Sequence, residues 1–316
     1  MLTSSMADGV ERVQGAFKRL KMSLERVLIG QDDVLEGLIA TALAGGHALL
    51  EGVPGLGKTW LAQNFARAAH LEYRRIQFTP DLMPADVTGT QVIENVGGAL
   101  SYRFQRGPAF TQLLLADEIN RATPKTQSAL LEAMQEGAIT VGGERYELPQ
   151  PFIVIATQNP LEMEGTYPLP EAQLDRFLAK VEVKRPNSET LKKVLEAGQL
   201  PIAQSALEPG ELLELRDIVR AVPISQPMLD FVVNLVESTH AQKDVRYGLS
   251  PRGAQALLGL ARAFALMNAR AFVSREDVLR AAPLATNHRL ILGFEAELEG
   301  IKPSDVLKRI LEAVKA

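Results

Sequence analysis

Residues 52–59 read Gly52-Val53-Pro54-Gly55-Leu56-Gly57-Lys58-Thr59 and match the phosphate-loop pattern G-x-x-x-x-G-K-[ST]. An apolar run that ends at Leu50 precedes it and predicts a buried strand, and the run from Trp60 to Ala69 predicts a helix. A helix N-terminus attracts anions through its free amide groups and its dipole. A chance match on a glycine-rich turn would not place strand and helix in register, so we expect the loop to bind a nucleoside triphosphate.

Each residue type in this loop has a role in binding phosphate. The glycines let the backbone close around the anion. Lys58 supplies a compact positive charge to the β and γ oxygens, and the Thr59 hydroxyl is placed to ligand Mg²⁺. The residues expected to bind the nucleotide are Gly52, Val53, Pro54, Gly55, Leu56, Gly57, Lys58, Thr59 and Trp60.

A second apolar run, Leu113 to Ala116, ends in the carboxylates Asp117 and Glu118. A buried parallel strand delivers such residues to its carboxyl edge. Asp117 would hold Mg²⁺ directly or through water, while Glu118 would orient and deprotonate the attacking water. Acidic residues are common at strand ends, so this pair alone does not identify a site. The phosphate loop upstream makes a chance occurrence unlikely. Together they predict hydrolysis of the nucleotide.

Three further polar residues are candidates for the same site. Asn159 follows a third apolar run, Phe152 to Ala156, and would position the water or touch the γ-phosphate, although an asparagine before proline is also a common turn former. Arg176 precedes another apolar stretch, and Arg252 opens an apolar helical run. Either arginine could equally be an exposed partner in an ion pair.

This ordered set of motifs resembles the AAA+ ATPases, and longer strings resemble the MoxR family more narrowly. The strings are FTPDLMPAD at 78–86, FQRGP at 104–108, DEINRA at 117–122 and EGTYPLPEAQLDRF at 164–177. They span most of the first two thirds of the chain. The last third matches only through Ser250-Pro251-Arg252 and its helical periodicity.

The resemblance implies roles that the motifs alone leave open. Asn159 matches the first sensor, Arg176 the arginine finger that reaches a neighbouring subunit's nucleotide, and Arg252 the second sensor on a lid. Gly30 and Gln31 match the segment that lines the adenine pocket. The implied cofactors are ATP and Mg²⁺.

The first part of the chain alternates strands with helices, which predicts an α/β core with a parallel five-stranded sheet covered by helices on both faces. The expected strands are His47–Glu51, Tyr73–Phe78, Leu113–Ala116, Phe152–Ala156 and Ala179–Val183. Residues 82–110, with Gly97-Gly98, predict a hairpin that interrupts a helix, and residues 139–147 predict a second hairpin. The resemblance implies that both project toward the central channel of a ring, and solvated edge ribbons are the alternative.

After Pro186 the pattern becomes nearly continuously helical. We therefore expect an AAA+ domain over residues 1–186 and an all-helical lid domain over residues 187–316. Ser188 to Thr190 would cap a helix with Leu191, Val194 and Leu195 on one face, and further helices are expected over 212–219, 228–236, 254–264 and 278–292. A lid that contacts ATP through Arg252 could convert loss of the γ-phosphate into domain rotation.

Composition and charge narrow the class of protein. The chain has 316 residues, enough for two packed units, and its 34 Lys and Arg against 38 Asp and Glu give a net charge of -4, which argues against strong nucleic-acid binding. With no cysteine there is no disulfide and no Cys-ligated zinc. The N-terminus lacks a basic and apolar leader, and no apolar run reaches the roughly 18 residues of a membrane span. We expect a cytoplasmic protein without membrane insertion.

The residues and the resemblance together predict an ATPase motor that forms a homo-oligomeric ring, expected to be a hexamer. The resemblance implies chaperone-like maturation of protein clients, including metalloenzyme complexes, and an adaptor protein bearing a von Willebrand factor A domain. A DNA-acting AAA+ motor and an assembly scaffold that ATP merely locks are the alternatives. Glu118 and Arg176 argue against the scaffold, and the acidic balance argues against DNA.

Overall fold

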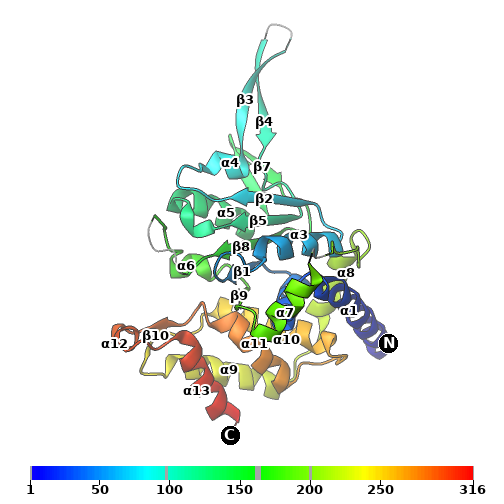
Figure 1. The fold of residues 1–316 in the computed structure, drawn as a ribbon, viewed down its shortest axis with the longest axis vertical. Coiled ribbons are helices and arrows are strands. Elements are labelled where there is room, and N and C mark those ends of the chain that lie inside the picture. Colours follow the sequence, from blue (N-terminus) through cyan, green and yellow to red (C-terminus); the bar gives the residue numbers. More distant parts are fainter. Residues whose placement is uncertain (1, 97–98, 161–164, 199–200, 316) are drawn as a thin grey trace.

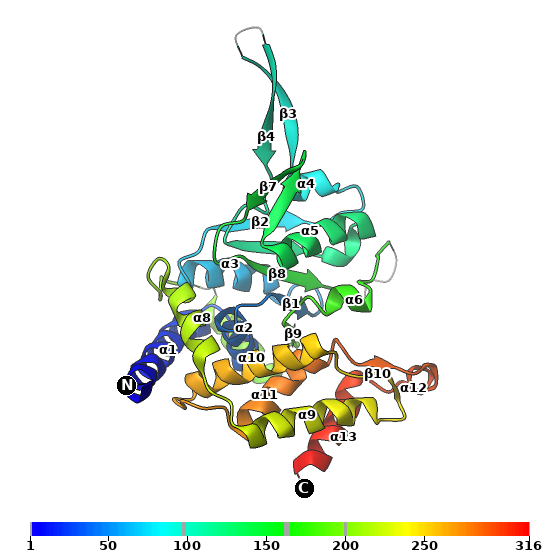
Figure 2. The ribbon, with the colours of Figure 1, turned by 180° about the vertical axis from the view of Figure 1, so that it is seen from behind.

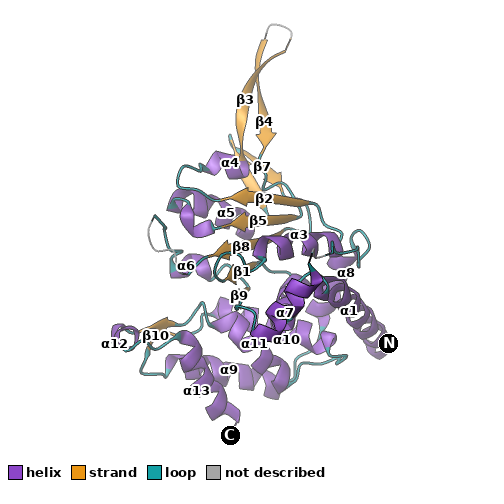
Figure 3. Ribbon diagram, viewed as in Figure 1, coloured by secondary structure: helices purple, strands orange, loops and turns teal. Residues whose placement is uncertain are grey.

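The computed structural model describes residues 2–96, 99–160, 165–198 and 201–315, and its centre is a parallel sheet (Figures 1 and 3). The sheet has five strands in the order β2-β5-β8-β1-β9. The strands are β1 (Ala48–Glu51), β2 (Tyr73–Gln77), β5 (Leu113–Asp117), β8 (Ile153–Gln158) and β9 (Ala179–Glu182). All five lie where the sequence predicts them, with ends shifted by one or two residues.

Alternate side chains of the central strands enter two separate cores. Leu113 and Leu115 of β5 join one apolar cluster, and Leu114 and Ala116 join the other. The first cluster includes side chains of α2 (Asp32–Leu43) and α3 (Lys58–Ala68), and the second includes those of α5 (Pro124–Glu136). A parallel strand that is covered on both faces must be apolar on both faces, which explains its unbroken apolar sequence. The predicted α/β core is thus confirmed.

The first insertion forms a long antiparallel hairpin that projects beyond the rest of the molecule (Figure 1). Its strands are β3 (Gly89–Val96) and β4 (Ala99–Arg106), and the predicted turn Gly97-Gly98 lies outside the described residues. Helix α4 (Pro84–Thr88) leads into the hairpin. No helix follows it within the described residues 107–112, so the prediction that the hairpin interrupts a helix is correct on one side only.

Gly107 and Pro108 account for the missing second half of that helix. A Cβ atom on Gly107 would lie 2.5 Å from the backbone nitrogen of Gly89, so the two strand ends meet in close backbone contact. Pro108 disfavours the helical conformation at the residue before it. The chain therefore leaves the hairpin in turns and enters β5 directly.

The second insertion is the predicted short hairpin, formed by β6 (Ala138–Val141) and β7 (Glu144–Glu147). Gly142 and Gly143 have φ of 62° and 84°, the left-handed conformation that the two-residue turn of a hairpin requires. The short hairpin supports the base of the long one, where Tyr146 stacks on Phe104 with ring centroids 4.3 Å apart.

The C-terminal part is mostly helical and lies on the other side of the sheet from the long hairpin (Figure 1). Its helices are α7 (Ser188–Ala197), α8 (Glu211–Ala221), α9 (Gln226–His240), α10 (Pro251–Met267), α11 (Arg275–Thr286), α12 (Phe294–Leu298) and α13 (Pro303–Lys315). Two short elements, η1 (Ile119–Arg121) and α6 (Glu171–Leu174), lie in the core region. No helix among the described residues combines the length and the apolar character needed to cross a membrane.

Two helix predictions in this part need correction. The helix expected over 278–292 ends at Thr286, and Ile291–Leu292 form β11, which pairs with β10 (Val245–Tyr247). The residues between them, His288 and Arg289, bond to the core segment 175–178 instead of continuing the helix.

Helix α7 is present, but its cap and its environment differ from the prediction. Its N-cap is Asn187, one residue before the predicted capping residues Ser188 to Thr190. The Asn187 side-chain oxygen accepts a hydrogen bond from the Thr190 backbone amide at 2.8 Å, so an amide at the start of the helix already has its partner. Leu191 and Leu195 are exposed, and none of the helix residues is buried, because the helix lies at the surface rather than inside a bundle.

Helix α1 (Leu2–Glu25) is an element that the motifs do not predict. Val13, Ala16, Leu20 and Leu24 are buried, and the helix packs on α3, α8 and α10 (Figure 2). Helices from both sides of residue 186 therefore share one core, and the domain boundary at that residue stays a prediction.

Candidate active site

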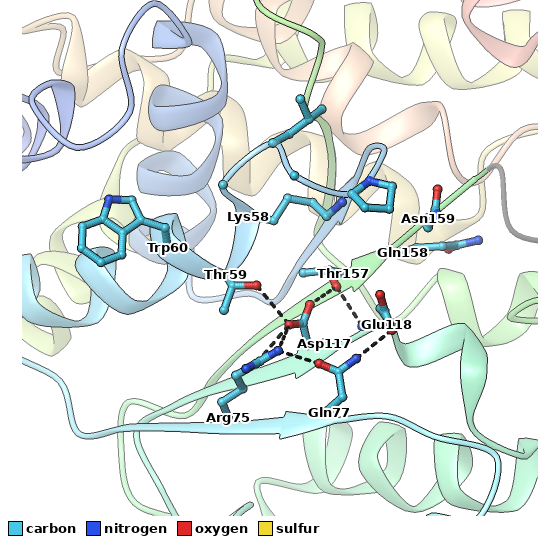
Figure 4. Close-up of a pocket in the computed structure, with 14 residues that line it drawn as sticks. Lys58, Thr59, Trp60, Arg75, Gln77, Asp117, Glu118, Thr157, Gln158 and Asn159 are labelled. Atoms are coloured by element: carbon cyan, nitrogen blue, oxygen red, sulfur yellow. Dashed lines mark hydrogen bonds and ion pairs between the residues drawn. The ribbon is translucent and has the colours of Figure 1, made fainter. Parts of the chain in front are cut away.

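A cavity of about 470 Å³ lies between the phosphate loop and the carboxyl ends of β5 and β8 (Figure 4). The sheet register explains why its polar residues meet, since Gln77 of β2 pairs with Asp117 of β5, and Leu50 of β1 pairs with Thr157 of β8. Carboxyl ends of parallel strands form one edge of a sheet, where ligands bind. The lining residues are Pro54, Gly55, Leu56, Gly57, Lys58, Thr59, Trp60, Arg75, Gln77, Asp117, Glu118, Thr157, Gln158 and Asn159.

Two glycines let the loop follow its path. Gly57 has φ of 79° and forms the N-cap of α3, so the first amide groups of that helix face the cavity. A Cβ atom on Gly52 would lie 2.6 Å from the carbonyl oxygen of Val183, so only glycine fits against the end of β9. The Lys58 amine donates to the carbonyl oxygens of Gly52 and Val53, the latter at 3.0 Å. The loop is thus shaped for an anion, with a cation lying across it.

The hydroxyl of Thr59 and the carboxylate of Asp117 fit a magnesium ion. The Thr59 Oγ1 atom donates to Asp117 Oδ2 at 3.0 Å. This separation matches the edge, about 2.9 Å, of an octahedron with Mg–O distances near 2.0–2.1 Å. The described residues contain no cluster of three or more His, Cys, Asp or Glu suited to a metal.

Glu118 is held in an uncommon backbone conformation that aims its side chain. It has φ of 56° and ψ of 51°, the left-handed region, which costs a non-glycine residue about 1 kcal/mol or more and occurs often at active sites. Its backbone nitrogen donates to Thr157 Oγ1 at 2.8 Å, and that hydroxyl donates to Asp117 Oδ1 at 2.6 Å. Its carboxylate accepts hydrogen bonds from Gln77 at 2.7 Å and from Arg121 at 3.0 Å.

Arg75 and Gln77 connect the two acids, and the motifs did not identify either one. Arg75 donates to Asp117 Oδ2 from Nε at 3.1 Å and from Nη2 at 2.7 Å, and its Nη2 also bonds Gln77 Oε1 at 2.6 Å (Figure 4). Thr157 was likewise missed. Alternation along β2 indicates only that Arg75 and Gln77 share a face, because strand residues two apart do so. That this face meets Asp117 follows from the pairing of β2 with β5, which the sequence does not show.

Asn159 and Trp60 differ in how they meet the cavity. Asn159 is buried, follows the end of β8 directly and lines the same cavity as Glu118 (Figure 4). The Trp60 ring points away from Asp117, although the residue lines the rim of the cavity. A sensor role for Asn159 and nucleotide contact by Trp60 stay predictions.

Four predicted residues lie elsewhere, and within the described part of the chain none of them lines this cavity. Arg176 lines a second cavity beside α5 and donates to the Leu131 carbonyl at 2.7 Å. Arg252 lies in the first turn of α10. Gly30 and Gln31 line a third cavity of about 610 Å³ between the end of β9, α7 and α11. Their roles as finger, second sensor and adenine contacts stay predictions.

A buried arginine connects the segment that carries Arg176 to the helical part through hydrogen bonds. Arg289 is only 3% exposed and donates to Asp175 Oδ1 and to the Phe177 carbonyl, both at 2.6 Å. Ser250, just before Arg252, donates to the same Asp175 carboxylate at 3.2 Å. The contacts tie the chain around Arg176 to α10 and α11.

The phosphate loop, the acidic pair and the strand order define a P-loop ATPase of the AAA+ class. Residues 47–179 match the family described as "ATPase family associated with various cellular activities (AAA)", and residues 237–310 match the "AAA lid domain". The chain belongs to the MoxR family of AAA+ ATPases.

Relatives and a solved structure support this assignment. The chain is 42% identical to the uncharacterised protein YeaC of Bacillus subtilis, over 92% of each chain. It is 39% identical to Chaperone MoxR1 of Mycobacterium tuberculosis, over 98% of this chain and 84% of the relative. A crystal structure of a Cytophaga hutchinsonii protein, 37% identical, superposes with a TM-score of 0.88 over 99% of this chain and 98% of that one.

Proposed function

We propose that this protein is a ring-forming motor that hydrolyses ATP and uses the cycle to remodel or mature other proteins. The observation that carries the proposal is the convergence of Lys58, Thr59, Asp117 and Glu118 on one cavity. The description of MoxR1 as a chaperone supports the choice of protein clients. A hexameric ring and an adaptor with a von Willebrand factor A domain are part of the proposal and are supported by the family resemblance.

Each side chain in the cavity has a separate role in the proposed reaction. Lys58 and the first amides of α3 hold the phosphates, while Thr59 and Asp117 hold Mg²⁺. The ion, when bound, neutralises charge on the β- and γ-phosphate oxygens. Glu118 accepts a proton from a water whose oxygen attacks the γ-phosphorus, and ADP leaves from the opposite side with the bridging oxygen. Gln77 and Arg121 hold the Glu118 carboxylate in place.

The long hairpin supports the proposal that the clients are polypeptides. Ile93 and Tyr102 pair across its strands and are 61% and 73% exposed, and Leu100 lies further along the same face. Phe104 continues this face down to its stack on Tyr146. Exposed apolar side chains gathered on one face are typical of surfaces that contact other chains.

The charges on the hairpins do not favour nucleic acid. Arg103 is paired with Glu94 at 2.7 Å, and Arg145 is paired with Glu147 at 2.9 Å. Phosphate binding gains its strength from cations that release counterions, and an arginine already neutralised by a carboxylate contributes little. The DNA-motor alternative therefore lacks a cationic strip on the described parts of the hairpins.

The proposal is tested by hydrolysis in the presence of a permanently unfolded polypeptide. We expect the polypeptide to stimulate phosphate release by the wild type, and the double variant Ile93→Ser/Tyr102→Ser to keep the basal rate but lose the stimulation. Leu298→Ser, which changes an equally exposed apolar residue on α12, should keep both. Undiminished stimulation of the double variant, or stimulation by submicromolar duplex DNA at physiological salt, would contradict the proposal.

A further inference from the structure

The side chain of Arg75 occupies an oxygen atom that the proposed chemistry requires. Asp117 Oδ2 accepts hydrogen bonds from Arg75 Nε at 3.1 Å, from Arg75 Nη2 at 2.7 Å and from Thr59 Oγ1 at 3.0 Å. A carboxylate offers about two acceptor positions on each oxygen. Oδ2 is therefore saturated with donors and has no acceptor position left for a metal ion or for a water bound to one.

The other carboxylate oxygen is held by the fold. Asp117 Oδ1 accepts the hydroxyl of Thr157 at 2.6 Å, and Thr157 is fully buried and in turn accepts the backbone amide of Glu118. The Thr59 hydroxyl can change from donor to acceptor by rotating its hydrogen, because a hydroxyl has both kinds of position. Arg75 carries only donors, so it must leave Oδ2 when the oxygen changes partner.

We infer that Arg75 stands in for the magnesium ion before nucleotide binds, and that its release from Asp117 sets how much magnesium the nucleotide complex requires. The inference rests on the proposed ATP site but not on the ring or on any client. The Arg75 guanidinium pairs with the buried Asp117 carboxylate and so compensates its charge. The Arg75 side chain is 46% exposed, so it can leave Asp117 and move into water.

The neighbouring residue on the same strand provides a matched control. Arg74 is also 46% exposed and also bonds a carboxylate, that of Glu72, at 3.3 Å. Successive strand residues point to opposite faces, so Arg74 lies away from the cavity that Arg75 lines. Neutralising either arginine changes the net charge equally, and only one of them touches Asp117.

The test measures binding of a non-hydrolysable ATP analogue by calorimetry at a series of free Mg²⁺ concentrations. We expect Arg75→Gln to lower the Mg²⁺ concentration for half-maximal tightening by about threefold to tenfold, the scale of a half-exposed charge pair. Arg74→Gln should match the wild type. Arg75→Lys, which keeps the charge but lacks the two-pronged donor, should fall between wild type and Arg75→Gln.

The outcomes separate this inference from the proposed function. An unchanged or raised magnesium requirement in Arg75→Gln would overturn it, and so would an equal shift in Arg74→Gln, which would indicate a general charge effect. If the wild type bound no analogue at any Mg²⁺ concentration, the nucleotide site itself would be wrong. Thermal unfolding followed by circular dichroism shows that each variant is folded before it is titrated.

Discussion

We expect replacements of Lys58 and Glu118 to separate nucleotide binding from chemistry, because the proposed roles of the two residues belong to different steps. Lys58 lies across the phosphate loop, and Lys58→Ala should abolish nucleotide binding. Glu118→Gln keeps the shape of the side chain but cannot accept the proton, so it should bind ATP normally and hydrolyse it about 10² to 10⁴ times more slowly. Calorimetry and phosphate release measure the two effects, and near-normal turnover by Glu118→Gln would show that another group is the base.

The sequence identified the residues that form motifs and missed those that support them. Lys58, Thr59, Asp117 and Glu118 could be predicted because their spacing reports a loop and a strand end. Arg75 could not, since its role depends on the pairing of β2 with β5, and the order of strands is a long-range property. The same holds for Thr157, which acts through the neighbouring strand.

Between elements, Arg289, which follows the end of α11, forms hydrogen bonds to the core segment that carries Arg176. Replacing it by leucine would leave the Asp175 carboxylate and the Phe177 carbonyl without this donor, and breaking a buried pair costs about 3–5 kcal/mol. We therefore expect Arg289→Leu to lower the free energy of unfolding by that amount in urea titrations.

An exposed arginine provides the control for this stability measurement. Arg246 lies on the surface of β10 over the ring of Tyr247, and Arg246→Leu should change the free energy of unfolding by no more than about 0.5 kcal/mol. A loss below about 1 kcal/mol in Arg289→Leu would mean that the contact contributes little to holding the helical part on the core.

The ends of elements were harder to predict than their existence. The five strands follow from their apolar runs, because a strand covered on both faces can carry little else. The end of α11 does not follow from periodicity, since His288 and Arg289 leave the helix to bond residues more than 100 positions earlier in the chain. Helix α1 does show buried positions three and four residues apart, at Val13, Ala16, Leu20 and Leu24, so periodicity alone could have predicted it.

At the scale of the whole molecule, a buried histidine makes stability depend on pH. Burial lowers the pKa of His47 to about 4, and its ring accepts from the Val154 amide at 3.0 Å and bonds the Met134 carbonyl at 3.1 Å as a neutral imidazole. The unfolded chain would take up a proton near pH 6.5, and the folded protein would not do so until about pH 4. Stability is therefore complete above about pH 6.5 and falls as the pH decreases toward 4.

Urea unfolding at pH 7 and pH 5 measures this dependence. His47 alone accounts for a loss of about 2 kcal/mol between these values, and His47→Gln should remove that part of the loss. His70→Asn, a change at an exposed histidine, is the control variant for the loss of a histidine. A pH dependence that is unchanged in His47→Gln would place the acid sensitivity elsewhere, for instance at buried His288, whose pKa is also lowered by burial.

We propose that the active unit is a ring in which Arg176 of one subunit serves the ATP of the next. An arginine supplied by another chain is worth about 10³ to 10⁵ in rate in GTPases, because its charge meets the charge that develops on the transferred phosphoryl group. Arg176→Ala subunits should therefore bind ATP but hydrolyse it poorly. Lys58→Ala subunits should bind none, yet they keep an intact arginine.

Phosphate release by a mixture of these two inactive variants tests whether Arg176 acts on the ATP of a neighbouring subunit. Subunit exchange creates interfaces at which an intact phosphate loop meets an intact Arg176, and in a random equal mixture roughly a quarter of all interfaces qualify. We expect activity to reappear at about that fraction of the wild-type rate, or at a lower fraction if the subunits hydrolyse ATP cooperatively. Demonstrably mixed rings without any recovery would contradict it, and would show either that Arg176 acts within its own subunit or that another residue, with Arg121 the next candidate, is the finger.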